Sequence, residues 1–326
     1  MKNVLDVKET QIAIKKLKDF FENTLAKKLN LVRVSAPLFV RPESGLNDNL
    51  SGKEEPVSFT MRNYEEKVEI VQSLAKWKRM ALKWYDFKVG EGLYTDMNAI
   101  RPSEKLDNIH SIYVDQWDWE KTISKSDRNE EYLKRVVEDI YEVFLETEKY
   151  INKLYPFLTH KLPDKITFIT SQELEDMYPK EDCKKREHNI CKEKGAVFLM
   201  KIGENLKSGK PHDGRAPDYD DWELNGDILF WDDVLDQALE LSSMGIRVDS
   251  IALMKQLKYT NSEERLKLKY HKLLAQDKLP FSIGGGIGQS RICMYFLEKQ
   301  HIGEVQASVW TEDIVNKCIN ENIFLL

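Results

Sequence analysis

Apolar residues recur every three or four positions near the start of the chain, and this spacing predicts an amphipathic helix over residues 8–29. An apolar stretch over residues 31–40 follows and predicts a strand. Pro37 lies within this stretch and has no N–H to donate, so we expect the strand at a sheet edge or an interface. A second long helical pattern covers residues 128–155, and nothing in it indicates a function.

Alternating apolar and polar positions over residues 92–101 and 111–120, joined by a polar loop, predict an antiparallel hairpin. Because side chains alternate between the two faces of a strand, Gln116, Asp118 and Glu120 share one face. The other face carries Tyr113, Asp115, Trp117 and Trp119. A strand divided in this way turns its polar face toward either solvent or a ligand.

Residues 67–72 also alternate like a strand, and Ser73 is a suitable N-cap for a helix through Lys83. The spacing predicts one buried face made of Leu74, Trp77, Ala81 and Trp84. Positive charges stand near the start of this helix, where the helix dipole disfavours them: Lys76, Lys78 and Arg79. They form either a solvated basic face or an anion site.

Short apolar runs at residues 166–169 and 196–200 predict buried strands that flank a helix, and an acidic loop over residues 212–221 precedes two further strands. Asp227 and Glu240 lie on these successive strands. Two such carboxylates suit Mg²⁺, which takes one or two carboxylates together with phosphate oxygens. A lone pair of acids is more often surface charge.

The most distinctive stretch runs from Gly284 to Arg291 and contains four glycines within five residues. Glycines between a strand and a helix let the backbone approach a ligand closely, and the helix start offers unpaired N–H groups to an anion. Arg291 in the first turns of that helix suits a phosphate. The stretch lacks the third glycine of the dinucleotide fingerprint and the Gly-Lys-Ser/Thr of a P-loop. The alternative is a glycine-rich turn for close packing of helix on sheet.

The 326 residues are 41% hydrophobic and carry a formal net charge of -6, with a pI of about 5.7. This balance argues against a protein whose main partner is nucleic acid. No apolar run approaches a membrane span and the start has no hydrophobic signal region, so we expect a cytoplasmic protein without a membrane partner. No repeat or linker divides residues 1–326, which predicts a single domain. Cys183, His188 and Cys191 lack a fourth zinc ligand and indicate an ordinary helix.

In this order, the elements resemble the catalytic core of the class II aminoacyl-tRNA synthetases. Arg101-Pro102-Ser103-Glu104, together with His110 and the strand ending in Glu120, resembles the second motif of that family, and Gly284 to Arg291 resembles the third. The resemblance implies an α+β fold, with a mainly antiparallel β-sheet flanked by helices.

A closer resemblance is to the ammonia-dependent asparagine synthetases, or aspartate–ammonia ligases, which are built on that core without tRNA-binding additions. The similar stretches are residues 48–52, 73–79, 90–95, 113–120, 215–222, 225–229 and 240–248. They cover nearly the whole chain and are weakest over residues 123–165 and the last dozen. The implied reaction converts L-aspartate, ammonia and ATP to L-asparagine through a β-aspartyl adenylate, with release of AMP and pyrophosphate.

The family resemblance also implies roles for individual residues. For aspartate it implies Asp48 near the ammonium, with Ser73, Lys78, Gln116 and Arg247 around the carboxylates. For the nucleotide it implies Arg101 at the α-phosphate and Arg291 at the far end of the triphosphate, with contacts from Ser111, Val114, Asp220, Ser242 and Gly286. Asp227 and Glu240 would hold Mg²⁺. The catalytic residues would be Arg101, Asp48, Gln116, Asp118 and Arg291, with Asp118 or Asp48 as the base that deprotonates ammonium.

The first helix, the strand and Pro37 resemble the first class II motif, which builds a two-fold interface, so we expect a homodimer. Two alternatives remain: a tRNA synthetase-like enzyme that activates an amino acid, and a catalytically inactive regulatory paralogue. The acidic charge and the lack of an anticodon-binding domain argue against the first. The presence of Arg101, Asp227, Glu240 and Arg291 argues against the second. A glutamine-dependent synthetase is disfavoured because residue 2 is Lys2 rather than a cysteine nucleophile.

Glu240 and Arg247 are an odd number of residues apart, so a regular strand would place them on opposite faces. Since both are assigned to one site, the strand must change parity between them. A bulge needs one inserted residue, and Gly245 tolerates the required dihedral angles. The sequence therefore predicts a bulge or strand break within residues 243–246.

Overall fold

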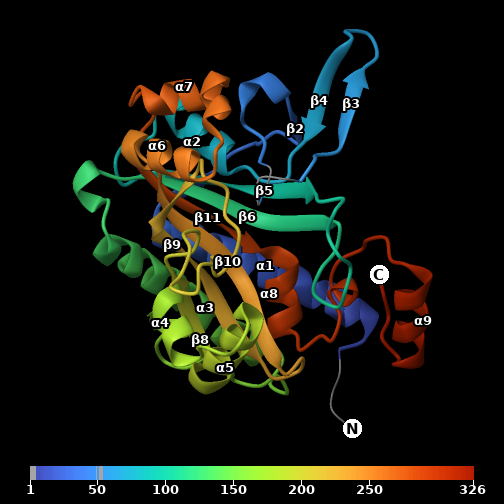
Figure 1. Cartoon of the computed structure of the whole chain (residues 1–326). Helices are drawn as coiled ribbons and strands as arrows, with labels where there is room; N and C mark the ends of the chain where they lie inside the picture. Colours follow the sequence, from blue (N-terminus) through green and yellow to red (C-terminus); the bar gives the residue numbers. More distant parts are fainter. Residues whose placement is uncertain (1–4, 49, 51–53) are drawn as a thin grey trace.

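The computed structural model describes residues 5–48, 50 and 54–326 (Figure 1). Lys2 and part of the similar stretch at residues 48–52 lie outside the described residues. The main element is an eight-stranded sheet in the order β1-β5-β6-β11-β10-β9-β8-β7. Its strands are β1 (Leu31–Arg33), β5 (Gly92–Ile100), β6 (Tyr113–Thr122), β7 (Thr167–Thr170), β8 (Ala196–Met200), β9 (Asp220–Asp232), β10 (Gln237–Arg247) and β11 (Ser282–Gly288).

The predicted α+β class is correct, but the sheet is mixed. The central strand pairs are antiparallel, whereas β1 pairs with β5 and β7 pairs with β8 in parallel at the two ends of the sheet. A parallel pair needs a long crossover. The chain makes one through α4 (Ser171–Met177) and α5 (Cys183–Lys194), and the other through α2 (Ala75–Trp84).

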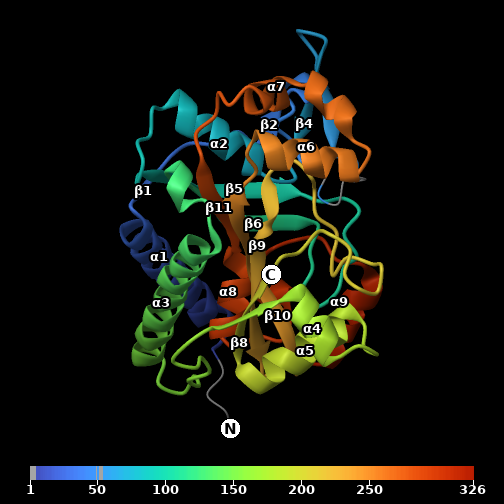
Figure 2. The ribbon, with the colours of Figure 1, turned by 60° about the vertical axis from the view of Figure 1, so that its left-hand side comes forward.

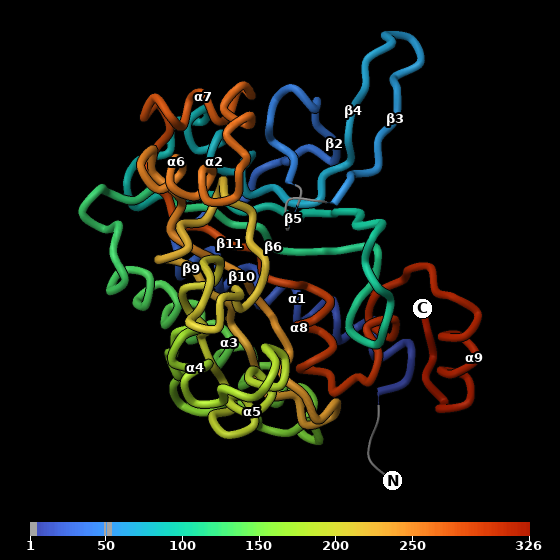
Figure 3. The backbone as a smooth tube through the Cα atoms, in the orientation of Figure 1, coloured from blue at the N-terminus to red at the C-terminus, as the bar shows by residue number. Residues whose placement is uncertain are grey.

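The crossover from β1 to β5 also contains a small second sheet in the order β2-β4-β3. Its strands are β2 (Phe39–Val40), β3 (Ser58–Met61) and β4 (Glu66–Ile70), and β3 and β4 project from the molecule (Figures 1 and 3). The predicted strand over residues 31–40 is therefore two strands with Pro37 between them. β1 is an edge strand of the main sheet, as the proline predicted.

Helices α1 (Val7–Leu29) and α3 (Glu130–Leu154) lie side by side against one face of the main sheet (Figure 2). Trp117 and Trp119 of β6 are buried on this face, and Trp117 stacks on Phe21 of α1 with ring centroids 4.8 Å apart. The aromatic face predicted for the second strand of the hairpin is therefore a core face. The polar face looks the other way.

The opposite face of the sheet is covered only in part. Helix α5 packs on β8, β9 and β10, while α2 packs near β6 and β11. The remaining helices are α6 (Ser250–Tyr259), α7 (Lys269–Ala275), α8 (Gln289–Phe296) and α9 (Glu312–Asn320), with 3₁₀ turns η1 (Pro42–Ser44), η2 (Lys125–Asp127), η3 (Glu263–Lys267) and η4 (Ile302–Glu304). The polar side chains of the central strands lie between these covers. Within the described residues, no helix combines the length and apolar character needed to span a membrane.

Two details of the predicted helix after Ser73 need correction. Leu74, Trp77 and Ala81 are buried as expected, but Trp84 is 50% exposed because it ends the last turn. The N-cap position is occupied by Leu74, and the Ser73 hydroxyl accepts a hydrogen bond from the backbone N–H of Ala75 at 3.1 Å.

Candidate active site

The glycine-rich stretch forms a central strand rather than a turn. Residues 282–288 make up β11, which pairs with β6 on one side and β10 on the other and continues directly into α8. None of its four glycines has a positive φ. A Cβ on Gly284 would lie 2.0 Å from Glu120 Oε2, and one on Gly286 would lie 2.4 Å from Gln116 Oε1. Gly284 and Gly286 therefore make room for polar side chains of the neighbouring strand β6.

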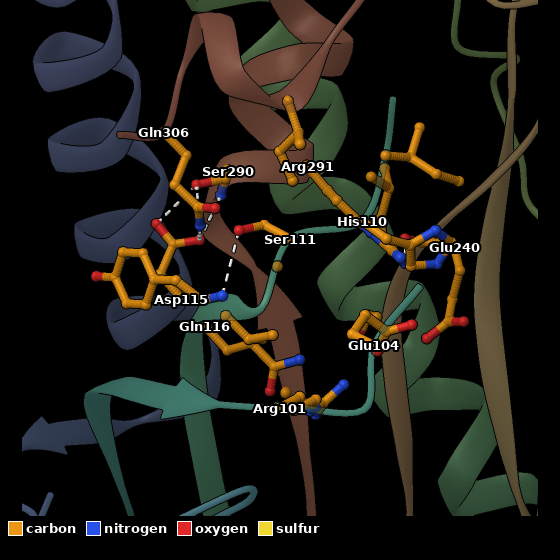
Figure 4. Close-up of a pocket in the computed structure, with 18 of the residues that line it drawn as sticks. Arg101, Glu104, His110, Ser111, Asp115, Gln116, Glu240, Ser290, Arg291 and Gln306 are labelled. Atoms are coloured by element: carbon orange, nitrogen blue, oxygen red, sulfur yellow. Dashed lines mark hydrogen bonds between the residues drawn. The ribbon is translucent and has the colours of Figure 1, made fainter. Parts of the chain in front are cut away.

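Two adjoining pockets open on this polar face of the sheet. The first, called here the Ser111 pocket, encloses about 180 Å³ (Figure 4), and the second, called the Asp48 pocket, encloses about 290 Å³. Five residues line both pockets: Arg101, Gln116, Glu240, Ser243 and Gly286. The pockets therefore meet at a boundary where a single ligand, or two reacting ligands, would contact both.

Lys78 and Asp118 form a buried ion pair in the wall of the Asp48 pocket. Lys78 Nζ lies 2.9 Å from Asp118 Oδ2 and donates to the carbonyl oxygen of Gly285 at 2.8 Å. Burial lowers the pKa of Lys78, although the Asp118 carboxylate opposes that shift. Asp118 Oδ1 is buried and has no hydrogen-bond partner.

Arg247 lies at the back of the same pocket, held by two carboxylates. Its Nε donates to both oxygens of Glu120 at 3.0 Å, its Nη2 donates to Glu120 Oε2 at 2.7 Å, and its Nη1 pairs with Asp220. Burial alone would raise the pKa of Glu120, but Arg247 holds it below its ordinary value. Asp220, assigned from sequence to the nucleotide, lines the Asp48 pocket and not the Ser111 pocket.

Asp48 enters its pocket on a loop fixed by backbone and amide contacts. Gln72 Nε2 donates to the carbonyl oxygen of Asp48 at 3.0 Å, and Asn47 Oδ1 accepts from the N–H groups of Asp48 and Gln72 at 2.9 Å each. Asp48 Oδ1 accepts from the N–H of Leu50, while Oδ2 is buried and has no hydrogen-bond partner among the described residues. Burial raises the pKa of Asp48 to about 6, although Lys76 opposes this. Ser73 lines the same pocket.

The Ser111 pocket contains the other residues assigned to a nucleotide. Ser111, Val114, Ser242, Gly286 and Arg291 line it. Ser242 Oγ is buried without a partner, and Arg291 Nη1 donates to the carbonyl oxygen of Glu240 at 2.8 Å. Arg101 lies at the boundary and contacts the carbonyl oxygen of Gln72 only at 3.4 Å, which leaves most of its guanidinium available to a ligand.

The start of α8 is not open to an anion in the way the sequence suggested. Asp115 Oδ1 accepts from the N–H of Ser290 at 3.1 Å, and Asp115 Oδ2 accepts from its hydroxyl at 2.8 Å. Gln306 Nε2 donates to the same carboxylate (Figure 4). Lys18 Nζ donates to it as well. The chain thus supplies its own anion to Ser290 at this helix terminus, whereas Arg291 lines the Ser111 pocket.

Asp227 and Glu240 lie on adjacent strands, but they differ in access. Glu240 lines both pockets, whereas Asp227 lines neither. Asp227 pairs with Arg215 through Oδ2, and its buried Oδ1 accepts no hydrogen bond from any residue that the structure describes. Burial raises the pKa of Asp227 to about 7, Arg215 opposes that shift and Glu240 adds to it. Among the residues that the structure describes, no cluster of three or more His, Cys, Asp or Glu side chains could hold a metal.

The predicted parity change on β10 is present, but it occurs earlier than expected. Leu239 and Leu241 face the core, and so do Met244 and Ile246, so the parity changes between the two pairs. The inserted residue lies between Glu240 and Ser242 in the pairing with β9, and pairing with β11 is unbroken from Ser242 to Ile246. A second register shift at Gly245 places its extra residues in β9. Glycine at 245 serves instead to admit Asp220, whose Oδ1 would lie 2.8 Å from an added Cβ.

The three cations near the start of α2 are all buried, so they do not form a solvated basic face. Lys76 pairs with Asp218 at 3.1 Å, Lys78 pairs with Asp118, and Arg79 donates to the carbonyl oxygens of Pro280 and Val248. Their partners are all distant in sequence, which is why the helical pattern alone could not predict them. The sequence also missed Ser243 and Tyr219 as pocket residues.

The fold is shared with aminoacyl-tRNA synthetases. It matches the crystal structure of asparaginyl-tRNA synthetase from Pyrococcus horikoshii complexed with asparaginyl-adenylate, with a TM-score of 0.66 and 14% identity over 91% of this chain and 68% of that one. The aspartyl-tRNA synthetase from Entamoeba histolytica matches with a TM-score of 0.60 and 17% identity over 91% of this chain and 58% of that one. The class II resemblance predicted from the motifs is thus confirmed at the level of fold.

The sequence itself is close to a narrower family. The family model for aspartate–ammonia ligase matches residues 8–322. The aspartate–ammonia ligase of Clostridium tetani is 65% identical over 326 residues, covering 100% of this chain and 96% of that protein. That of Fusobacterium nucleatum is 64% identical over 322 residues, covering 99% and 98%. The chain belongs to the aspartate–ammonia ligase family, as its sequence predicted.

Proposed function

We propose that the protein ligates ammonia to L-aspartate: ATP adenylates the side-chain carboxylate, pyrophosphate leaves, and ammonia attacks the β-aspartyl adenylate to give L-asparagine and AMP. The observation that carries the proposal is the meeting of the two pockets at Arg101. One pocket is lined by cations and a buried free carboxylate oxygen, which suits an amino acid. The other leads from Arg101 to Arg291, which suits a triphosphate.

Adenylation brings two anions together, so cations must offset the charge that develops at the α-phosphate. Arg101 is the cation that lines both pockets, and we assign it to the α-phosphate. Arg291, which lines only the Ser111 pocket, is assigned to the far end of the triphosphate. Ser111, Val114, Ser242 and Gly286 would contact the rest of the nucleotide, whereas Asp220 would act through Arg247.

For aspartate, the unpartnered oxygen of Asp48 would accept a hydrogen bond from the ammonium group of the amino acid. Lys78 and Arg247 would attract the two carboxylates of aspartate. Gln116, at the boundary of the two pockets, and Ser73 would orient the side chain of the bound aspartate. Asp118 Oδ1 and Asp48 Oδ2 could each take a proton from the ammonium ion that supplies the new nitrogen, so both remain candidate bases.

Asp227 and Glu240 would hold Mg²⁺, and the unpartnered Asp227 Oδ1 supports this assignment. The carboxylates alone are too few for a complete site, which fits an ion that takes its other ligands from phosphate oxygens and water. Bound there, Mg²⁺ would neutralise phosphate charge. We further propose that the chain forms one catalytic domain, works as a cytoplasmic homodimer and needs neither nucleic acid nor a membrane.

Product analysis tests the proposal. With aspartate, ATP-Mg²⁺ and ammonium, the purified protein is expected to form asparagine together with equimolar AMP and pyrophosphate. ADP and phosphate as the products would contradict it. Equal yields with glutamine in place of ammonium would contradict the assignment of ammonia as the nitrogen donor.

The aspartate KM is expected to rise as the pH falls through about 6. Asp48 has a raised pKa of about 6, so it is a carboxylate above that pH and loses its charge below it. The attraction of Asp48 for the ammonium group of aspartate is therefore lost at pH values below about 6. Steady-state kinetics between pH 5 and 8 would measure the effect, and the Asp48→Asn variant is expected to show a high, flat KM. A profile unchanged by this substitution would rule out Asp48 as the ammonium-binding group.

Two glycine substitutions in β11 and at its end form a matched pair. Gly286→Ala would place a Cβ 2.4 Å from Gln116 Oε1 and 2.9 Å from Asp118 Oδ1, so both side chains must move. Gly288→Ala meets nothing closer than Arg291 Cβ at 3.4 Å, an ordinary contact. We expect kcat/KM for aspartate to fall at least tenfold in the first variant, on the order expected when catalytic groups are misplaced by about 1 Å. The second is expected to stay near wild type, and similar losses in both would contradict the account.

A further inference from the structure

Asp218 forms a buried hub behind the Asp48 pocket. Its side chain is fully buried, and its Oδ2 accepts from Lys76 Nζ at 3.1 Å, from Arg265 Nη1 at 2.7 Å and from His271 Nε2 at 2.7 Å. Lys76 comes from α2, whereas Arg265 and His271 come from η3 and α7, two successive elements almost 190 residues further along the chain. One carboxylate oxygen thus joins three elements, while Oδ1 has no hydrogen-bond partner in the described part of the chain.

None of the four hub residues lines either pocket, so none is placed to touch a substrate. The hub nevertheless reaches the loop that carries Asp48. Gly45, three residues before Asp48, has a φ of +69°, and a Cβ there would lie 2.8 Å from Leu268 Cβ and 3.2 Å from His271 Nδ1. The turn that delivers Asp48 therefore rests directly on the start of α7 and on the histidine that Asp218 holds.

The hub and Asp48 also interact through charge. Burial is the largest influence on the pKa of Asp48; Lys76 favours the carboxylate and Asp218 disfavours it. Burial alone would lower the pKa of Arg265, but the carboxylates of Asp218 and Asp48 raise it above its ordinary value. Burial alone would raise the pKa of Asp218, but its three donors hold it well below its ordinary value. Asp218 is thus charged and its Oδ2 is held by three donors of the protein, whereas Asp48 lines a pocket that a ligand can enter.

We propose that Asp218 is a positioning residue for recognition of the ammonium group of aspartate. By binding Lys76, Arg265 and His271 with one carboxylate oxygen, it fixes the support on which the Asp48 loop rests. This inference rests on the proposed role of Asp48 in binding aspartate. The hub holds the acceptor in place before the substrate arrives, so less of the binding free energy is spent on ordering the loop.

The experiment uses His271 because its loss leaves the charges of the hub intact. His271→Asn is too short to replace the Nε2 donor, whereas His271→Gln can place an amide nitrogen near the same position. We expect His271→Asn to raise the aspartate KM about tenfold, within the range of couplings between residues of one network, with the ATP KM and kcat changed by less than about threefold. His271→Gln is expected to stay within about threefold of wild type.

A double-mutant cycle with Asp48→Asn separates positioning from general loosening. If the hub acts through Asp48, His271→Asn has no further effect on the aspartate KM once Asp48 has been replaced. Asp218→Asn is expected to behave like His271→Asn where it folds, as judged by thermal unfolding; if it does not fold, the histidine pair alone decides the question. Glu175→Gln provides the control, because Glu175 forms a similarly buried pair with Arg186 at 3.1 Å outside both pockets.

Additive effects of Asp48→Asn and His271→Asn would overturn the proposal, as would an equal rise in the aspartate KM for Glu175→Gln. An Asp48→Asn variant with an unchanged aspartate KM would instead show that the proposed ammonium site is wrong, and the positioning role would fall with it. The two failures are therefore distinguishable.

Discussion

Arg101→Ala is expected to lower kcat by roughly 10²- to 10³-fold, the cost of removing one preorganised group that stabilises developing charge. Its aspartate KM is expected to change by less than about threefold, since the α-phosphate contact strengthens in the transition state rather than in the ground state. Within the described part of the chain, Arg101 contacts the carbonyl oxygen of Gln72 at 3.4 Å and forms no ion pair, so its removal leaves no described carboxylate without its partner.

Steady-state kinetics with both substrates would test this, with Arg33→Ala as the control. Arg33 pairs with Asp96 at 2.7 Å on the exposed edge strand and lines neither pocket. A large rise in the aspartate KM with kcat preserved would mean that Arg101 binds the amino acid, and the assignment of the two pockets would have to be exchanged.

Removal of Arg247 is expected to affect stability first and substrate binding second. The sequence resemblance alone predicts that Arg247→Ala mainly raises the aspartate KM. The structure adds that Arg247 neutralises both Glu120 and Asp220 in a buried site. Breaking a buried pair by removing one partner costs about 3–5 kcal/mol, because the remaining charge is uncompensated. Urea unfolding near pH 7.5 would measure this cost.

The destabilisation by Arg247→Ala is expected to shrink as the pH falls. In the wild type, Arg247 lowers the pKa of Glu120, so the stability from this pair is fully present above the ordinary glutamate pKa of 4.5 and is lost as the pH falls through the lowered pKa. Without Arg247, protonation of Glu120 removes the unpaired charge. Combining Arg247→Ala with Glu120→Gln is therefore expected to recover part of the loss. An Arg247→Ala variant as stable as wild type at pH 7.5 would contradict the buried network.

The sequence predicted the elements whose pattern is local. Period 2 on β6 predicted that Trp117 and Gln116 lie on opposite faces, and the structure has Trp117 in the core and Gln116 lining both pockets. The glycine-rich stretch was misread because glycine is rare in strands, and only the neighbouring strands explain it: Glu120 and Gln116 occupy the space where its side chains would lie.

Other features depend on register or on distant partners. Counting residues between Glu240 and Arg247 established that parity must change, but the bulge position depends on how β10 aligns with β9. The burial of Lys76 follows from Asp218, which is 142 residues away. No helical pattern carries that information. The residue assignments themselves came from family resemblance, and the structure brings most of them to two adjoining pockets.

The most direct test of the central claim, activation of the aspartate side chain as an adenylate, is an isotope transfer. With aspartate labelled by ¹⁸O in its side-chain carboxylate, that oxygen attacks the α-phosphate, and ammonia then displaces AMP from the carbonyl carbon. The C–O bond to the transferred oxygen breaks in the second step, so mass spectrometry is expected to find one ¹⁸O in each AMP. Unlabelled AMP, or ¹⁸O in inorganic phosphate released alongside ADP, would contradict the account.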